Sequence, residues 1–598
     1  MIAHRIEALR GLMKEWGWNA AVVVGGDPHN SEYTPQRWCQ RRFISGFTGS
    51  AGVVVVTAEH AGLWVDSRYH IQAARELEGS GIEMHRMISV EESGWMEWIA
   101  AEVPVGGTVG VDGLCMSSSD ASRLQSLVSA RSARVVSKPD FLDALWPDRP
   151  ALPKDPVWQH DGKYAGMSRK DKLEWLRGVM REKQCRYALV TALDQIAWLL
   201  NIRSGDIDYC PVVISFAVVS ADNVVLFAEL SKFGADVRPA LENDGVVLRP
   251  YGEVSDYILS LHPDGRILMD AESVNYELAQ SVDAAFGPEG VVRCQSPVEL
   301  AKAVKNPIET DGFRRAYVMD GIAQTRFFRW LEESMASGAV ITESDAADRQ
   351  RKLRAECPDF IGESFETISA YQENSALPHY STVRGKDAVL RPHGLYLNDS
   401  GAHYRYGTTD ITRTVPLGPT TQLEREDYTI VLKAMIDLAM AVFPAGTPGC
   451  RLDAVCRRPL WQTMRNFGHG TGHGVGNVLS VHEGPQTIRQ NLKGQSIVPG
   501  MVTSDEPGIY REGMHGIRHE NMILCVPLGE NAFGSWLGFE TLTCTYIDTD
   551  AVIPELLDRD EIEWLNGFNG RVCETLSPLL DRKDSDWLAR KTRPISRT

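Results

Sequence analysis

The chain has 598 residues, of which 43% are hydrophobic and 24% charged, and its formal net charge is −17 at pH 7. These values are ordinary for folded domains, and they exclude a disordered chain, a collagen-like repeat and a membrane protein. The acidic balance, without basic stretches between aromatic residues, also makes nucleic acid an unsuitable partner. At about 150 residues per domain, the length predicts roughly four domains, or fewer large ones.

The cysteines and the apolar runs indicate the compartment. Eleven cysteines are scattered along the chain without a Cys-x-x-Cys pair, which indicates neither a disulfide framework nor a thiolate zinc site. The N-terminus carries Ile6, Leu9, Met13 and Trp16 at helical spacing among charges, unlike the apolar block of a signal peptide. The longest apolar runs, such as 53–56, are strand-sized and far below the ~20 residues that span a bilayer. We therefore expect a cytoplasmic protein.

An internal repeat organises the first half of the chain. The segment RIEALRGLMKEWGWNAAVVVGGD from Arg5 resembles KLEWLRGVMREKQCRYALVTALD from Lys172 at a constant offset. Each copy predicts an amphipathic helix that leads into a short apolar strand. Further strands are predicted over 52–57, 63–66, 212–220 and 224–229. Although helix followed by strand is common in α/β proteins, the identities in register favour a duplication.

The repeat and two breaks predict three domains. A Pro-rich stretch, WPDRPALPKDP, marks the first boundary, and KNPIETDGF marks the second. We expect two similar α/β domains over 1–160 and 161–305, followed by a larger unit over 306–598. At about 290 residues, this third unit is near the upper size for a single core.

The third unit is predicted to open with a helix after Pro307, because apolar residues recur at helical spacing over 313–331. Strand-like segments then alternate with helices over about 422–443 and 452–466. An apolar stripe over 565–579 predicts one terminal helix. We interpret that helix as a packing or dimer-facing element.

Four carboxylates of the third unit lie beside turns between predicted strands. In YLNDSGAHYRYGTTDITRT, Asp399 and Asp410 lie in two strand-like runs that a hairpin would bring together. In SDEPGIYREGMHGIRHEN, Glu506 and Glu520 flank a second turn rich in glycine. Any one of them alone would more often be a solvated turn residue, so the prediction depends on their convergence.

Histidines accompany these carboxylates. The segment GHGTGHGVGNVLSVHEGP contains His469, His473 and His482 where glycines let backbone approach a ligand closely, and His379 lies in ENSALPHY. This oxygen-rich set without sulfur suits Mn²⁺ or another borderline-hard divalent ion. Because four adjacent carboxylates would repel one another, we expect two divalent cations and a binuclear hydrolase that activates a bridging water.

The order Asp399, Asp410, His473, Glu506, Glu520 resembles the five metal ligands of the pita-bread metallopeptidases. The chain also resembles the long, three-domain form of the aminopeptidase P family in five segments: FETISA, LPHY, NDSGAHYRYGTTDITRTV, HGTGHGVGNVLSVHEGP and EPGIYREGMHGIRHEN. The resemblance covers almost the whole chain, including GFTGSAG and VDSRYHIQA. It implies an α/β (α+β) architecture of two related creatinase-N-terminal-like α/β domains followed by a C-terminal pita-bread catalytic domain with a helical extension.

The resemblance also implies the metal ligands. Asp410 and Glu520 would bridge both metals, and Asp399 would chelate one of them. His473 and Glu506 would complete the other, and Glu506 would also serve as the general base. The implied cofactors are two divalent metal ions, with Mn²⁺ ahead of Zn²⁺ or Co²⁺.

The remaining implied catalytic residues would surround the substrate. His379, His469 and His482 would contact substrate or the tetrahedral intermediate, and Arg518 would lie behind the ligands or at the substrate end. The implied activity is removal of the N-terminal residue from peptides with proline in the second position, by a hydroxide that bridges the two metals. The implied protein is a homodimer that binds neither nucleic acid nor membrane.

Other functions stay open on the sequence. Prolidase uses the same ligands on Xaa-Pro dipeptides, although the duplicated leading domains argue against it. Methionine aminopeptidase would leave about half the chain unexplained, and creatine-type amidinohydrolases share the fold without metals. A non-catalytic pita-bread binding module would predict a degraded ligand set, whereas all five positions are filled.

Overall fold

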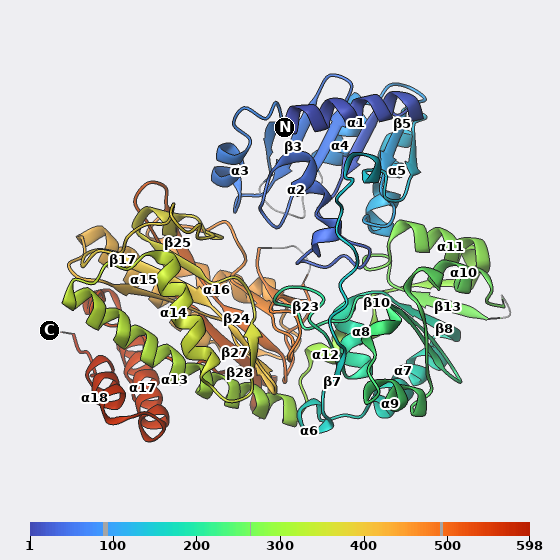
Figure 1. The fold of residues 1–598 in the computed structure, drawn as a ribbon. Helices are drawn as coiled ribbons and strands as arrows, with labels where there is room; N and C mark the ends of the chain where they lie inside the picture. The colour runs from blue at the N-terminus through green and yellow to red at the C-terminus, as the bar shows by residue number, and fades with distance from the viewer. Residues whose placement is uncertain (88–93, 263–264, 491–493, 598) are drawn as a thin grey trace. The chain divides into compact units, whose positions relative to one another are not determined.

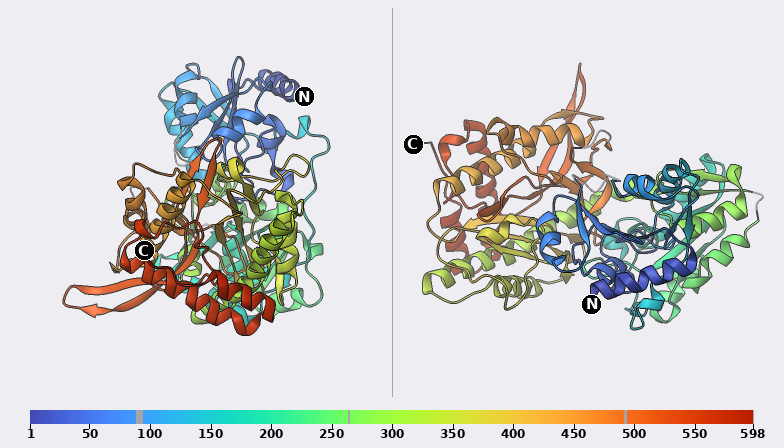
Figure 2. Two further views of the ribbon diagram at one scale, coloured as in Figure 1. Left: turned by 90° about the vertical axis from the view of Figure 1, so that its left-hand side faces the viewer. Right: turned by 90° about the horizontal axis from the view of Figure 1, so that it is seen from above.

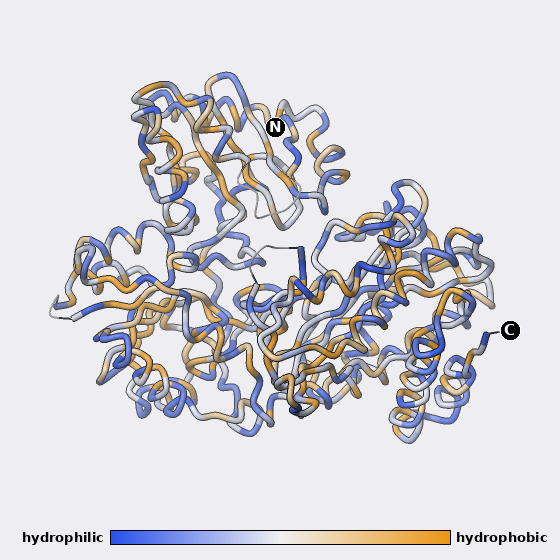
Figure 3. The backbone as a smooth tube through the Cα atoms, turned by 180° about the vertical axis from the view of Figure 1, so that it is seen from behind, coloured by the Kyte–Doolittle hydropathy of each residue, from blue (hydrophilic) through white to orange (hydrophobic). Residues whose placement is uncertain are grey.

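The structure is a computed structural model that describes residues 1–87, 94–262, 265–490 and 494–597. The chain forms two compact units, which are coloured along the chain in Figure 1. The first unit comprises Met1–Asp161 and Met167–Glu299, and the second comprises Gly162–Gly166 and Leu300–Thr598. Hydrophobic and hydrophilic stretches alternate along the backbone (Figure 3), and none of the described helices is long and apolar enough to cross a membrane.

Two mixed sheets with the same topology form the first unit. Within the described residues, their strand orders are β4-β3-β2-β1-β5-β6 and β12-β11-β10-β8-β13-β14. The strands of the first sheet are β1 (Ala20–Val23), β2 (Val53–Thr57), β3 (Ala61–Val65), β4 (Glu83–Arg86), β5 (Thr108–Val111) and β6 (Arg134–Ser137). Those of the second are β8 (Cys185–Val190), β10 (Ser215–Ser220), β11 (Val224–Ala228), β12 (Val246–Pro250), β13 (Arg266–Met269) and β14 (Val291–Arg293).

The pairing directions of the two sheets also agree. β1 is antiparallel to β2 and parallel to β5, and β8 is likewise antiparallel to β10 and parallel to β13. Helix α1 (Ile2–Trp16) leads into β1, and α7 (Arg169–Glu182) leads into β8. Each helix buries the apolar stripe that the repeat predicted. The predicted helix followed by strand is therefore confirmed in both copies.

One strand of the second copy is shorter than predicted. The sequence predicted a strand from residue 212, whereas β10 begins at Ser215. The backbone N–H of Ile214 donates to the buried carboxylate of Asp206 at 2.7 Å, and that of Val212 donates to the Cys210 carbonyl. Local hydrogen bonds thus replace the sheet ladder before Ser215.

The second unit places helices around several antiparallel sheets. Among the described residues its largest sheet has the order β21-β28-β27-β24-β22-β23, and a three-stranded sheet has the order β16-β17-β20. The strands are β16 (Ile368–Tyr371), β17 (Leu395–Ser400), β20 (Ile411–Pro416), β21 (Phe443–Pro444), β22 (Gly472–Gly474), β23 (Glu483–Ile488), β24 (Val502–Asp505), β25 (Gly508–Arg511), β26 (His515–Arg518), β27 (Asn521–Asn531) and β28 (Gly534–Thr541). The helices are α13 (Pro307–Ser337), α14 (Glu343–Ala355), α15 (Gln422–Ala439), α16 (Gly449–Gln462), α17 (Arg559–Leu576) and α18 (Arg582–Lys591).

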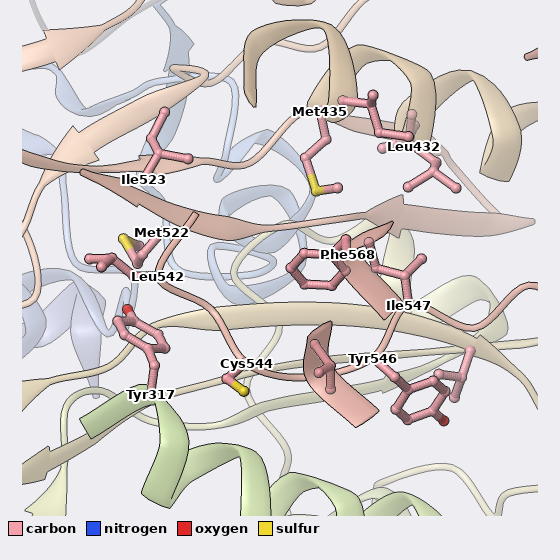
Figure 4. Close-up of a cluster of buried hydrophobic side chains, with 14 of the residues drawn as sticks. Tyr317, Leu432, Met435, Met522, Ile523, Leu542, Cys544, Tyr546, Ile547 and Phe568 are labelled. Atoms are coloured by element: carbon pink, nitrogen blue, oxygen red, sulfur yellow. The ribbon is translucent and has the colours of Figure 1, made fainter. Parts of the chain in front are cut away.

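The core of this unit lies on both sides of β27. Figure 4 shows Leu432 and Met435 of α15 above the strand that carries Ile523, and Tyr317 of α13 below it. All four side chains belong to one buried hydrophobic cluster. Helices thus cover both faces of the sheet. Figure 2 shows the β27–β28 hairpin projecting from this unit, and Phe533 at its tip is 87% exposed.

The predicted helix after Pro307 is confirmed as α13, where Asn306 and Glu309 form a capping box. The predicted helix 422–443 ends earlier, at Ala439, because Phe443 begins the short strand β21 (Phe443–Pro444), which pairs with β28. The predicted helix 452–466 is wrong by a few residues at each end, since α16 runs from Gly449 to Gln462.

The predicted terminal helix over 565–579 is confirmed as α17 except at its end, and a further helix, α18, follows it. α17 ends at Leu576, and a short 3₁₀ turn with Pro578 in its first turn carries Leu579 before α18 begins. Proline lacks the N–H that would continue the helical ladder, which explains the break.

Close packing on α13 gives a test of the fold. A Cβ at Gly321 would lie 2.1 Å from the Cys544 carbonyl oxygen, whereas a Cβ at Gly567 in α17 would meet nothing within 4 Å. We expect Gly321→Ala to destabilise the protein by roughly 1–3 kcal/mol through overpacking. Gly567→Ala should instead stabilise it by up to about 1 kcal/mol through helix propensity. Urea unfolding measures both, and equal stabilisation by the two substitutions would contradict the contact.

Candidate metal centre

The first strand pair of the centre positions two aspartates. β17 runs antiparallel to β20 with Asp399 opposite Thr412, and Asp410 directly precedes β20. The backbone N–H of Asp410 donates to the hydroxyl of Tyr317 at 3.1 Å. Both carboxylates are buried. The prediction that a hairpin-like pairing brings these two residues together is confirmed.

The second strand pair positions two glutamates. β24 and β27 are antiparallel with Asp505 opposite Asn521, so Glu506 and Glu520 lie side by side at the strand ends. The backbone N–H of Glu520 donates to the Thr412 carbonyl at 3.1 Å, and the Thr412 hydroxyl donates to Glu520 Oε2 at 2.7 Å. Thr412 thus connects the second strand pair to the first.

His473 enters the same place from β22. Its Nδ1 lies 3.0 Å from the Gly474 carbonyl oxygen, which requires Nδ1 to carry the proton and leaves the Nε2 lone pair free for a ligand. The flanking glycines permit this position. A Cβ at Gly472 would lie 2.0 Å from the Ser504 carbonyl oxygen, and one at Gly474 would lie 2.2 Å from the Glu483 carbonyl oxygen.

The five predicted ligands converge. One ligand atom each from Asp399, Asp410 and Glu520 lie within 4.8 Å of one another, and the same holds for His473, Glu506 and Glu520. His473 Nε2 lies 3.4 Å from Asp410 Oδ2 and 3.5 Å from Glu506 Oε1. These two overlapping groups share Glu520 and are linked through Asp410, as two adjacent metal ions would require.

The pKa shifts in the centre show that its negative charges are unfavourable without bound cations. Burial raises the pKa of Glu506 to about 7, against the opposing charges of His473 and Arg518. Burial and the neighbouring carboxylates raise the pKa of Glu520 well above its ordinary value. Burial lowers the pKa of His473, but its hydrogen bond to Asp410 and the adjacent carboxylates outweigh this and raise it to about 9.

One oxygen of the centre also lacks a protein partner. Asp399 Oδ1 is buried and has no hydrogen-bond partner among the described residues. Burial of a carboxylate oxygen without a hydrogen-bond partner lowers the stability of the folded state unless a cation binds the oxygen. The donor set and its charges therefore fit two divalent ions.

The predicted substrate-side residues lie around this centre. Arg518 forms an ion pair with Asp399, and its Nη2 donates to the carbonyl of Pro378, directly before His379. His482 offers a nitrogen within 4.8 Å of ligand atoms of Asp410 and His473, and its ring lies 4.2 Å from that of His473. His482 thus lies close enough to be a further ligand.

Tyr510 is a site residue that the sequence analysis did not identify. Its hydroxyl accepts from Arg518 Nη1 at 2.6 Å and lies 2.8 Å from His469 Nε2. Burial raises its pKa to about 12, so it remains protonated and able to donate. Tyr510 lies in the segment EPGIYREGMHGIRHEN, but the sequence of that segment does not distinguish it from an ordinary tyrosine in a hairpin.

Comparison with known proteins gives a consistent set of relatives. Residues 311–527 match Metallopeptidase family M24, and 535–595 match the C-terminal region of that peptidase. Residues 5–144 and 148–309 each match the Creatinase/Prolidase N-terminal domain. The two matches to one domain agree with the equal topology of the two sheets.

Full-length relatives are also found. The chain is 38% identical to a probable Xaa-Pro aminopeptidase P of Tuber melanosporum and 36% identical to one of Ajellomyces capsulatus, with 99% of each chain covered in both comparisons. It is 33% identical to an X-prolyl aminopeptidase from Caenorhabditis elegans, a cytosolic enzyme with a di-nuclear active site. That structure superposes with a TM-score of 0.95 over 100% of both chains.

The raised pKa of Glu506 predicts how stability depends on pH after metal is removed with a chelator. Its pKa rises from 4.5 to about 7 on folding, so the folded state favours the neutral carboxyl. That contribution is present below pH 4.5 and is lost as the pH rises to about 7. We therefore expect metal-free Glu506→Gln to gain stability over the metal-free wild type as the pH increases from 4.5 to 7. Thermal unfolding at both pH values measures the difference, and a constant difference would contradict the prediction.

Proposed function

The chain belongs to metallopeptidase family M24, and from this premise we propose that it is a metal-dependent aminopeptidase that hydrolyses the Xaa-Pro bond at the N-terminus of peptides. The observation that carries the proposal is the convergence of five side chains, four of them carboxylates, in one centre where three of the carboxylates are buried. A protein that only binds peptides has no need to keep so costly a cluster. The full-length similarity to Xaa-Pro aminopeptidase P proteins supports the same activity.

We assign the ligands as the resemblance implied. Asp410 and Glu520 would contribute to both ions, Asp399 would hold one, and His473 with Glu506 would hold the other. When bound, the two ions neutralise the carboxylates and lower the pKa of a water toward neutrality. Mn²⁺ is the preferred ion of the proposal because the set is mainly oxygen, and Zn²⁺ and Co²⁺ are the alternatives.

Glu506 acts as the general base in this proposal. The Ser504 hydroxyl donates to Glu506 Oε1 at 3.2 Å, and the backbone N–H of Glu506 donates to the Thr471 carbonyl at 2.8 Å. These bonds fix the carboxylate beside His473. Glu506 takes a proton from the attacking water and returns it to the leaving proline nitrogen.

Two histidines stabilise the negative oxygen that develops on the scissile carbonyl. His379 and His482 are the proposed donors, and His469, whose two ring nitrogens lie at the Gly470 carbonyl and the Tyr510 hydroxyl, is proposed to contact the substrate. Arg518 holds both Tyr510 and Asp399, so it couples the histidine side of the site to a metal ligand. Loss of one donor to such an oxygen typically lowers the rate about 10²- to 10³-fold.

The acidic centre also accounts for the selection of an N-terminal residue. The free α-amine of the substrate would lie beside this centre, whereas an internal peptide bond offers no free amine. A proline in the second position has no N–H, so the site cannot depend on a donor from that residue. Recognition therefore requires shape and contacts to the ring.

The proposal also covers the domain limits, the oligomeric state and the location of the protein. We propose domain limits near 1–160, 161–305 and 306–598, a homodimer, and a cytoplasmic location. The family matches that change at residues 144–148 and 309–311 support limits close to these. The exposed apolar tip at Phe533 offers a surface for a second copy. Light scattering on the purified protein tests the dimer, and a monomeric mass would contradict it.

Replacing Glu506 tests its role as base. Glu506→Gln keeps the size of the side chain but cannot accept the proton, so we expect turnover of an Xaa-Pro-Xaa tripeptide to fall at least ~10²-fold. Glu530→Gln, on the exposed β27–β28 hairpin, is the matched control and should retain wild-type turnover. Steady-state kinetics with equal metal content measure both, and wild-type turnover by Glu506→Gln would refute the assignment.

Metal restoration tests both the cofactor and the substrate class. The enzyme is stripped with chelator, restored separately with Mn²⁺, Zn²⁺ or Co²⁺, and assayed on Xaa-Pro-Xaa, Xaa-Pro and Met-Ala peptides. We expect cleavage of Xaa-Pro-Xaa only after restoration, with Mn²⁺ the most effective. Cleavage confined to the Xaa-Pro dipeptide would identify a prolidase, and no cleavage with any ion would favour a binding module.

A further inference from the structure

A second group of metal-ligating side chains lies in the first unit, at an edge of its first sheet. His60 lies in the turn between β2 and β3, and Glu83 and His85 lie on the edge strand β4. Because they are two residues apart on one strand, Glu83 and His85 project from the same face. One ligand atom from each of the three side chains lies within 4.8 Å of the other two.

The spacing of the two imidazoles suits a shared ion. His60 Nε2 lies 3.1 Å from His85 Nε2. Two imidazole nitrogens that bind one Zn²⁺ at about 2.0–2.1 Å in tetrahedral geometry lie roughly 3.3 Å apart. Glu83 Oε2 is 3.8 Å from His60 Nδ1, and its side chain is 69% exposed, so the carboxylate can turn toward the ion without disturbing packed groups.

Gly62 leaves space for the imidazole rings of His60 and His85, because it has no side chain. Gly62 lies on β3 opposite Glu83. A Cβ at Gly62 would lie 2.7 Å from His60 Nε2 and 2.9 Å from His85 Cδ2. The two rings thus occupy the volume that any other residue at position 62 would fill.

Two tryptophans hold the imidazoles in place. The ring of His85 stacks on Trp64 at a centroid distance of 4.0 Å and an interplanar angle of 7°. The His60 ring lies 4.8 Å from that of Trp98. Trp64 is buried, so this support is part of the core of the sheet. Ligands held in this way lose little freedom on binding an ion.

The fold itself does not require this group. In the second sheet, β12 has the place that β4 has in the first, and it reads VVLRP without histidine or carboxylate. The two sheets share their strand order and pairing directions, so a common edge geometry does not explain the three side chains.

We propose that His60, Glu83 and His85 form a second metal site, which binds one divalent transition-metal ion of the Zn²⁺, Ni²⁺ or Cu²⁺ class and fastens β4 to the β2–β3 turn. Two imidazoles with one carboxylate favour these ions, whereas the candidate metal centre is rich in oxygen and suits Mn²⁺. The solvent-exposed side of the site leaves the remaining coordination positions to water. This proposal does not depend on the proposed activity.

Calorimetric titration of the full-length, Mn²⁺-loaded protein with Zn²⁺ tests the proposal. We expect one Zn²⁺ to bind to the wild type beyond any exchange at the candidate metal centre. His85→Phe keeps a ring against Trp64 but removes the nitrogen, and it should abolish this binding. Glu83→Gln should weaken it by roughly 10- to 100-fold. Comparing wild type with His85→Phe subtracts exchange, because both retain the same candidate metal centre.

The control is His262→Ala, which removes an exposed histidine elsewhere in the first unit and should bind Zn²⁺ like the wild type. Circular dichroism establishes that each variant is folded, and His60→Asn provides an independent ligand variant. Electron paramagnetic resonance with Cu²⁺ gives a second readout, since the wild type should show an additional nitrogen-split signal that is absent from His85→Phe. Equal Zn²⁺ binding by the wild type and His85→Phe, or no additional Zn²⁺ in the wild type, would overturn the proposal.

Discussion

Mutual repulsion among four closely grouped carboxylates, three of them buried, is the constraint on which the second unit depends. Asp399, Asp410, Glu506 and Glu520 lie where burial already penalises their charge, and each raises the cost of ionising its neighbours. Strand pairing from two directions places them there, because each pair of carboxylates lies in or beside one antiparallel ladder. The stored repulsion is also what gives the centre its affinity for cations.

The groups around the carboxylates both restrain and orient them. Thr412 connects the two strand pairs through one backbone and one side-chain hydrogen bond to Glu520. Arg518 compensates Asp399 and reaches Tyr510, which in turn reaches His469. A single arginine thereby joins a candidate metal ligand to the proposed substrate-binding side. Replacing it would alter charge and geometry together, so its two roles are not separable by one substitution.

The two sheets of the first unit show how a duplicated fold can diverge at its surface. Their strand order, pairing directions and leading helices agree. Their edges differ, since β4 carries Glu83 and His85 whereas β12 carries aliphatic residues and an arginine. The core positions fix the topology, and edge positions are free to change because they do not pack between layers.

The sequence by itself determined the duplication, the helix beginning at Pro307 and the identity of the five candidate ligands. Each of these is encoded locally, in identities at a constant offset, in a capping residue beside proline, or in a motif. The ends of α15 and α17 were not determined in this way, because strand β21 and Pro578 end helical patterns that hydrophobic spacing alone would extend.

Only the tertiary structure decided which distant residues meet. Tyr510 and Thr412 have no distinctive sequence signal, and their roles arise from contacts across more than one strand pair. The approach of His60 to His85 depends on the absence of a side chain at Gly62 between them. Local patterns specify elements and candidate chemistry, whereas side-chain convergence depends on register and packing between segments far apart in the chain.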